Sequence, residues 1–145
     1  MTTSSKTPVK ADILNDLAER CEQSNGANRN IDVDIVFALH PDIGAYQPHC
    51  RGEEPRFWND PFYKQPCPKF TASIDAAMAL ADGRAFTVGQ NVHHHHWVAS
   101  VNVLDDGSPT SLGSSNACKS PALAVCAAAL RAHAALLAQK GNSHV

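Results

Sequence analysis

The sequence lacks the short motifs that identify common enzyme classes. It contains no Gly-x-Ser-x-Gly, no glycine-rich phosphate loop and no His-Glu-x-x-His, which mark serine hydrolases, nucleotide-phosphate sites and zinc peptidases. Ser73 and Asp75 stand at an expected helix start, where capping explains them. Cys67 lies between two prolines without a neighbouring base that would make it a nucleophile. These absences favour a protein that acts by binding over an enzyme.

Charge and long apolar segments are also scarce. Only 18% of the residues are charged and the net charge is −2, so no long-range attraction to nucleic-acid phosphates is expected. The N-terminus has no apolar core of signal-peptide length, and no run reaches the roughly eighteen apolar residues that cross a bilayer. We expect a cytoplasmic protein with neither a membrane nor a nucleic acid as its partner.

The five cysteines form no Cys-x-x-Cys pair and have irregular spacings. An odd number of cysteines in a chain without an export signal predicts reduced thiols rather than a disulfide framework. Cys118 and Cys126 are expected to be small buried hydrophobic residues.

Hydrophobic periodicity predicts four helices and one hairpin. The helices are expected at residues 10–26, 30–39, 71–83 and 120–140, and the strands at 85–92 and 95–104, around a turn at Gly89-Gln90-Asn91. The order is α-α-loop-α-β-β-α, an α/β fold (an α+β sandwich) with helices packed on a small antiparallel sheet. One domain should span residues 10–140, between a disordered tail at 1–9 and a second tail at 141–145.

Local signals predict where the helices begin and which faces they bury. Asn30, Thr71 and Ser120 are expected N-caps, and Pro121 suits the first position of the last helix. Segment 31–39 also alternates like a strand, so two interpretations compete there. The third helix is predicted to bury Ile74, Ala77, Met78 and Ala81, and the last helix to bury Leu123, Cys126, Ala127, Leu130, Ala134 and Leu137.

Four consecutive histidines, His93 to His96, precede Trp97. Neighbouring strand residues point to opposite faces, so at most His93 and His95, or His94 and His96, share a side. A zinc site needs further ligands, for which the weak candidates are His49, Cys50, Cys67 and the Asp105-Asp106 turn. No cofactor is expected, although the run would bind zinc or nickel adventitiously. The imidazoles can instead form a proton-sensitive patch for a partner or an anion.

A proline-rich loop at residues 41–68 carries five large aromatic residues. Long loops in compact domains are often functional, but their aromatics can also simply anchor them to the core. On the functional interpretation, Phe57, Trp58 and Tyr63 would join Trp97 in stacking on a base or gripping a protein.

The order of several segments resembles the phage ABA-sandwich domain family, small proteins encoded by phages and prophages. The resemblance covers roughly residues 13–135 and is most specific at "FTASIDAA" and "PALA". It implies an α/β sandwich with helices over an antiparallel sheet, and it supports a helix at 30–39. It carries no catalytic residue, and the four histidines depart from its pattern.

These observations lead to a hypothesis with two alternatives. The first is a non-enzymatic phage or prophage accessory protein that binds a host or phage protein, or a small nucleotide-type ligand, in the bacterial cytoplasm and antagonises host defence. The second is a metal-binding protein or metal-dependent hydrolase that uses His93 to His96, and the third is a self-assembling phage structural component. A homodimer is compatible with each of them.

Overall fold

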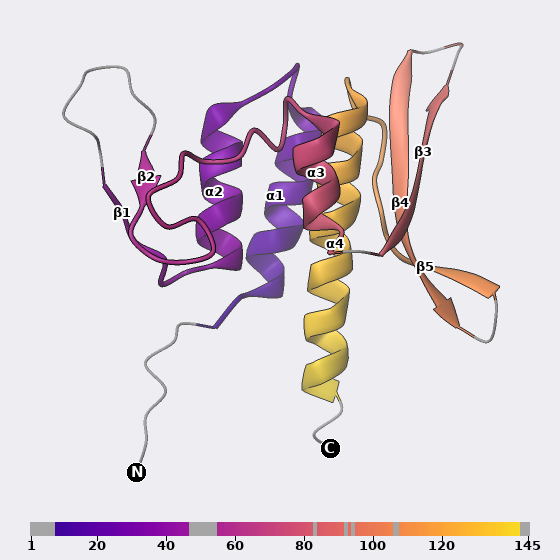
Figure 1. Ribbon diagram of the computed structural model, residues 1–145. Coiled ribbons are helices and arrows are strands. Elements are labelled where there is room, and N and C mark those ends of the chain that lie inside the picture. The colour runs from indigo at the N-terminus through magenta and orange to yellow at the C-terminus, as the bar shows by residue number, and fades with distance from the viewer. Residues whose placement is uncertain are drawn as a thin grey trace.

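The computed structural model (Figure 1) describes residues 8–46, 55–82, 84–91, 93, 95–105 and 108–142. Its elements are α1 (Ala11–Gln23), α2 (Arg29–Leu39), β1 (Ala45–Tyr46), β2 (Arg56–Phe57), α3 (Ile74–Leu80), β3 (Ala85–Asn91), β4 (His96–Asp105), β5 (Ser108–Ser114) and α4 (Pro121–Asn142). The fold is of the expected α+β class, with four helices and a small antiparallel sheet. The sheet has three strands, one more than the sequence predicted. Several predicted features lie outside the described residues, namely His49, Cys50, His94, Asp106 and both extreme tails.

The first two helices form where periodicity predicted them. α1 buries Leu14, Leu17, Ala18 and Cys21. Segment 29–39 is helical, so the competing strand interpretation is wrong. Its N-cap is Asn28 rather than Asn30, because the Asn28 side chain accepts hydrogen bonds from the backbone N–H groups of Asn30 (2.9 Å) and Ile31 (3.2 Å). The N-cap thus lies two residues earlier than the sequence signal suggested.

The third helix differs from its prediction in both its cap and its buried face. Ser73, not Thr71, caps it, accepting from the backbone N–H of Ala76 at 3.3 Å. Thr71 is instead buried and bonded to Asp32. Ala77 and Ala81 are buried as predicted and Leu80 is buried as well, whereas Ile74 and Met78 remain 37% and 41% exposed.

The three-stranded sheet has the order β3-β4-β5, all antiparallel. The predicted hairpin is confirmed, but β3 continues through Asn91, which pairs with His96, so the turn lies later than Gly89-Gln90-Asn91. β5 was not predicted, because its sequence SPTSLGS contains a single large apolar residue and shows no alternation. In the proline-rich loop, β1 and β2 form a short pair in which Ala45 lies opposite Phe57.

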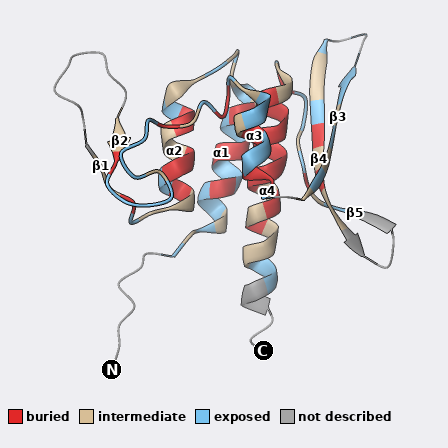
Figure 2. Cartoon of the chain, viewed as in Figure 1, coloured by how far each residue is buried: buried red, intermediate tan, exposed pale blue. Residues whose placement is uncertain are grey.

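α4 is the central element of the fold. It lies between the sheet on one side and α1 and α3 on the other, and its first half is buried all round (Figure 2). Ser120 caps it as predicted, accepting from the N–H of Leu123 at 3.2 Å, and the predicted buried positions are buried except Leu137, which is half-buried. The stretch Pro121–Gln139 is long and apolar enough to cross a membrane, contrary to expectation, but 61% of it is buried, as in a core helix.

The alanines of α4 allow an unusually close approach to β5 at Gly113. A Cβ atom added there would lie 2.5 Å from the carbonyl oxygen of Ala128 and also against the backbone nitrogen of Ala132. Both contacts are with backbone atoms, which cannot rotate away as a side chain can. Only glycine therefore fits between the sheet and the helix at this position.

We expect Gly113→Ala to lower the free energy of unfolding by about 1–3 kcal/mol, because it overpacks a buried contact. The matched control is Gly89→Ala in β3, where an added Cβ meets nothing within 4 Å and the expected change is about 0.5 kcal/mol or less. Denaturant melts of both variants measure the difference. Equal stabilities would show that α4 and β5 are not packed this closely.

A partly buried ion pair at the edge of the core joins α1 to α4. Two guanidinium nitrogens of Arg131 contact the carboxylate of Glu22, with Nη2 at 2.8 Å from Oε1, and the backbone N–H of Asn116 donates to Oε2 at 2.6 Å. Burial alone would raise the pKa of Glu22, but the hydrogen bonds from Arg131 and Asn116 outweigh it and lower the pKa. The stabilisation from this carboxylate is therefore present above the ordinary glutamate pKa and is lost as pH falls through the lowered one.

Two further predictions from the sequence need correction. Val9 was assigned to a tail with nothing to bury, yet it packs against the core. Cys67, whose position between two prolines in the long loop would allow an exposed thiol, is 3% exposed. Cys118 and Cys126 are buried as predicted, and burial, with the nearby Glu22 charge, raises the pKa of Cys118 to about 12. Its thiol therefore stays protonated at neutral pH.

A candidate ligand-binding cavity among the helices

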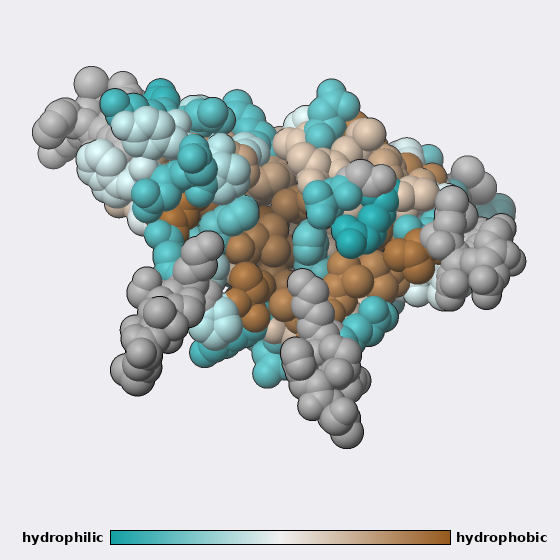
Figure 3. Space-filling view, turned by 60° about the horizontal axis from the view of Figure 1, so that its bottom comes forward, coloured by the Kyte–Doolittle hydropathy of each residue, from teal (hydrophilic) through white to brown (hydrophobic). Residues whose placement is uncertain are grey.

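A cavity of about 600 Å³ opens on the face where α1 begins and α2 ends. Its apolar wall consists of Val9, Leu14, Val36, Leu39, Pro61, Phe62, Phe70, Ala79, Leu80, Leu136 and Leu137. Figure 3, which brings the bottom of the molecule forward, shows hydrophobic residues gathered across the middle of this face. The volume lies within the range of pockets that hold small organic molecules.

His40 stands at one side of this cavity, directly after α2. Its backbone N–H donates to the carbonyl oxygen of Val36 at 2.8 Å, which ends the helix and fixes the residue. Its ring packs edge-on against Phe62, with 5.8 Å between the ring centroids. Burial, and then the charge of the nearby His133, lower the pKa of His40 below its usual value of 6.5. Its imidazole is therefore predominantly neutral at pH 7.

His133 enters the same cavity from α4. Its Nε2 lies 2.7 Å from the carbonyl oxygen of Leu80 at the end of α3. A carbonyl oxygen can only accept, so Nε2 carries the hydrogen of this bond. Nδ1, the other ring nitrogen, has no hydrogen-bond partner within the described part of the chain; it accepts when the ring is neutral and donates when the ring is protonated. The ring is thus held by α3 while one nitrogen stays available to a ligand.

The two charged residues that line the cavity are Asp82 and Arg84. Asp82 follows α3 with a positive φ of 55°, and its Oδ2 lies 3.5 Å from Nη1 of Arg84. Because the Asp82 side chain is 76% exposed, water screens this pair and it holds the arginine only weakly. The remaining guanidinium donors can therefore bind an acidic or carbonyl oxygen of a ligand.

The wall of the cavity is largely apolar, and its polar side chains are those of His40, Asp82, Arg84 and His133. What the cavity offers is apolar surface with a few convergent polar groups, the usual composition of a small-molecule site.

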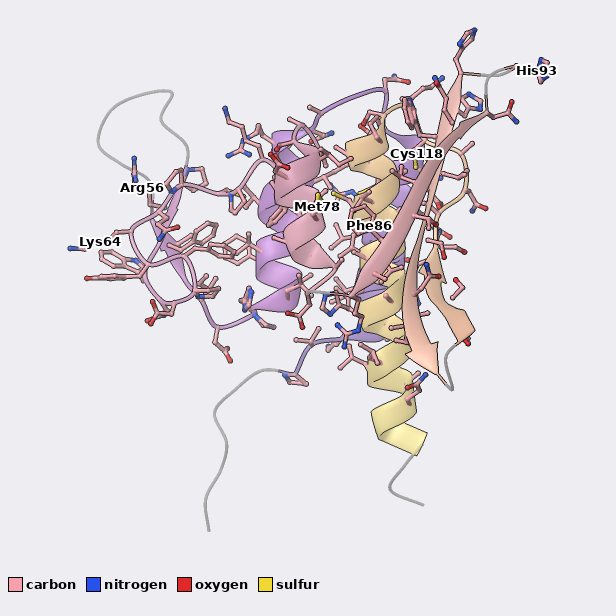
Figure 4. The ribbon with its side chains drawn as sticks, turned by 45° about the vertical axis from the view of Figure 1, so that its right-hand side comes forward. Arg56, Lys64, Met78, Phe86, His93 and Cys118 are labelled. Atoms are coloured by element: carbon pink, nitrogen blue, oxygen red, sulfur yellow. The ribbon has the colours of Figure 1, made fainter. Side chains whose placement is uncertain are left out.

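The histidine run predicted as a site lies elsewhere, on the hairpin of β3 and β4. His93 and His95 are exposed in the turn, where His95 has a positive φ of 56°, whereas His96 and Trp97 are half-buried at the start of β4. Figure 4 shows His93 at the far end of this hairpin, away from the loop that carries Arg56 and Lys64. Among the described residues, no three His, Cys, Asp or Glu side chains gather in a metal-binding group.

The loop aromatics are also separate from the histidine run. Phe57 is fully buried, edge-on to Phe37 at 6.0 Å and beside Phe62. Trp58 and Tyr63 are 52% and 49% exposed at the surface of the loop. Phe57 is thus part of the core, while the other two can still contact a partner.

The sequence contained only faint signals for the cavity. His133 is a polar residue in an otherwise alanine- and leucine-rich helix, and His40 follows a helix end. Local spacing cannot predict that both side chains line one cavity, because this depends on how the helices pack.

Comparison with known proteins adds no precedent for this site, since no family model, curated protein or solved structure is similar to the chain.

Proposed function

We propose that the protein binds a small amphipathic molecule in the cavity lined by His40 and His133. The observation that carries this proposal is the convergence of two imidazoles, one directly after α2 and one in α4, on one largely apolar cavity of about 600 Å³. A cavity with apolar walls would gain free energy by enclosing an apolar ligand, and a few polar groups would fix its orientation.

The polar groups indicate the chemistry of the ligand. Nδ1 of His133 would accept a hydrogen bond from the ligand, and Arg84 would donate to an acidic or carbonyl oxygen. One guanidinium beside the carboxylate of Asp82 is a poor match for several phosphates, so an aromatic or aliphatic acid fits better than the nucleotide-type ligand expected from the sequence.

The biological setting of this proposal comes from the sequence resemblance. In a phage or prophage, a small cytoplasmic binding protein would act by sequestering a host metabolite or signal, and antagonism of host defence is one outcome of such sequestration. The setting is independent of the cavity, which can be tested without knowing the natural ligand.

A fluorescent probe with aromatic rings and one sulfonate, 1-anilinonaphthalene-8-sulfonate, tests the cavity in the full chain. We expect saturable binding of one probe per chain. Ala79 lines the cavity from the exposed face of α3, so Ala79→Phe should fill the mouth and weaken binding about tenfold or more, equivalent to about 1.4 kcal/mol.

The matched control is Ala72→Phe, which adds the same ring at an exposed position that does not line the cavity. It should leave the probe affinity unchanged. The proposal fails if the fluorescence does not saturate, or if both phenylalanine variants bind the probe as the wild-type protein does.

A further inference from the structure

Strand β3 forms an edge of the sheet that lacks the usual protection. On one side it pairs with β4, and among the described residues no strand pairs with its other side. Its sequence, AFTVGQN, contains no charged residue and no proline. Natural edge strands normally carry lysine, proline or a bulge, because their unpaired backbone groups recruit other strands.

The opposite edge of the sheet is built differently. β5 contains Pro109, and a register shift between Val101 and Asn102 interrupts its pairing with β4. Both features discourage further pairing at that edge. Of the two edges of the sheet, the β5 edge thus carries features that discourage further strand pairing, and the β3 edge does not.

Exposed apolar side chains accompany the β3 edge. On α3, Ile74 and Met78 are 37% and 41% exposed, and on β3 the side chains of Phe86 and Val88 are half-buried, packed in part against the core. α3 and β3 both pack on α4, and Figure 4 shows Met78 and Phe86 on the same side of the molecule. An open edge and an apolar surface thus occur together.

We propose that two copies of the chain pair antiparallel through their β3 strands, about a two-fold axis, so that the two three-stranded sheets become one. A second copy is the occupant that these features fit best, because antiparallel pairing of a strand with itself satisfies both open edges and closes the assembly. Two uncharged strands also bring no like charges into opposition. Ile74 and Met78 of each copy would pack across the same interface.

The mass of the untagged full chain in solution tests this dimer. By analytical ultracentrifugation over a series reaching about 100 µM, a range that covers interfaces of standard size, the wild-type protein should approach twice the chain mass of 15.5 kDa. Thr87→Lys in β3 and Met78→Lys in α3 should each raise the dissociation constant about tenfold or more. Both side chains are exposed, so the melting temperature of the monomer should not change.

Ser111→Lys is the matched control, since it adds the same charge at an exposed position on β5 and should leave the dimer intact. In the dimer, hydrogen exchange of the Ala85–Gln90 amides should slow as the protein is concentrated. A wild-type protein that stays monomeric throughout the series would overturn the proposal. The candidate partner of the β3 edge would then be a strand of another protein. Lysine variants that dimerise as well as the control would overturn it too.

Discussion

Replacing Asp32 by alanine is expected to lower the free energy of unfolding by about 3–5 kcal/mol, because it leaves the groups around a buried carboxylate without their acceptor. Asp32 is fully buried in α2. Its Oδ1 accepts from both the hydroxyl and the backbone N–H of Thr71, each at 2.8 Å, and its Oδ2 lies 2.7 Å from Nη1 of Arg29. The carboxylate thus joins the start of α2 to the segment before α3.

Asp34→Ala is the control for this prediction. Asp34 lies on the same helix and also pairs with an arginine, Nη1 of Arg20 at 2.7 Å, but both side chains are about half exposed. Surface pairs of this kind contribute about 0–1 kcal/mol. Urea melts of the two variants should therefore differ by several kilocalories per mole, and similar small losses would show that Asp32 is not buried as the structure places it.

Leu130→Ala is the second change with a large expected effect, a loss of about 2–5 kcal/mol. Leu130 is fully buried in α4, where the neighbouring residues are mostly alanines that cannot move in to fill a void. The lost methyl groups and the remaining cavity both contribute to the cost. Chemical denaturation of the variant and the wild-type protein measures it.

Two companion variants of α4 separate packing from helix propensity. Leu130→Met nearly conserves the volume and should cost less than about 1.5 kcal/mol, and Gln139→Ala, at an exposed position of the same helix, should change stability by about 0.5 kcal/mol or less. A Leu130→Ala loss no larger than that of Gln139→Ala would contradict the central position of α4.

The sequence predicted those elements whose signals are local. α4 was placed correctly because Ser120 and Pro121 mark its start and its apolar residues recur around the helix. The cap of α3 was predicted wrongly, and so were two of its four predicted buried positions, Ile74 and Met78. The wrong cap has a non-local cause. Thr71 is a good capping residue in isolation, but Asp32, 39 residues earlier, holds both its hydroxyl and its N–H.

The candidate site was beyond local patterns. Four adjacent histidines are conspicuous in the sequence, yet those that the structure describes lie at a hairpin turn and at the start of the next strand. His40 and His133 are individually unremarkable, and only the packing of α2 and α4 on α1 places them on one cavity. β5 was not predicted because its sequence contains a single large apolar residue, Leu112, next to Gly113, and these two residues give no periodic signal.

The most direct measurement of ligand binding is a methyl NMR titration of the full chain with 1-anilinonaphthalene-8-sulfonate. We predict saturable shift changes at Leu39, Leu136 and Leu137, which line the cavity, and contacts between their methyl protons and the naphthalene ring. The methyl groups of Val98, exposed on the sheet, should not shift. Shifts spread over Val98 and other exposed methyl groups, or none at the three leucines, would contradict the proposal that this cavity is the binding site.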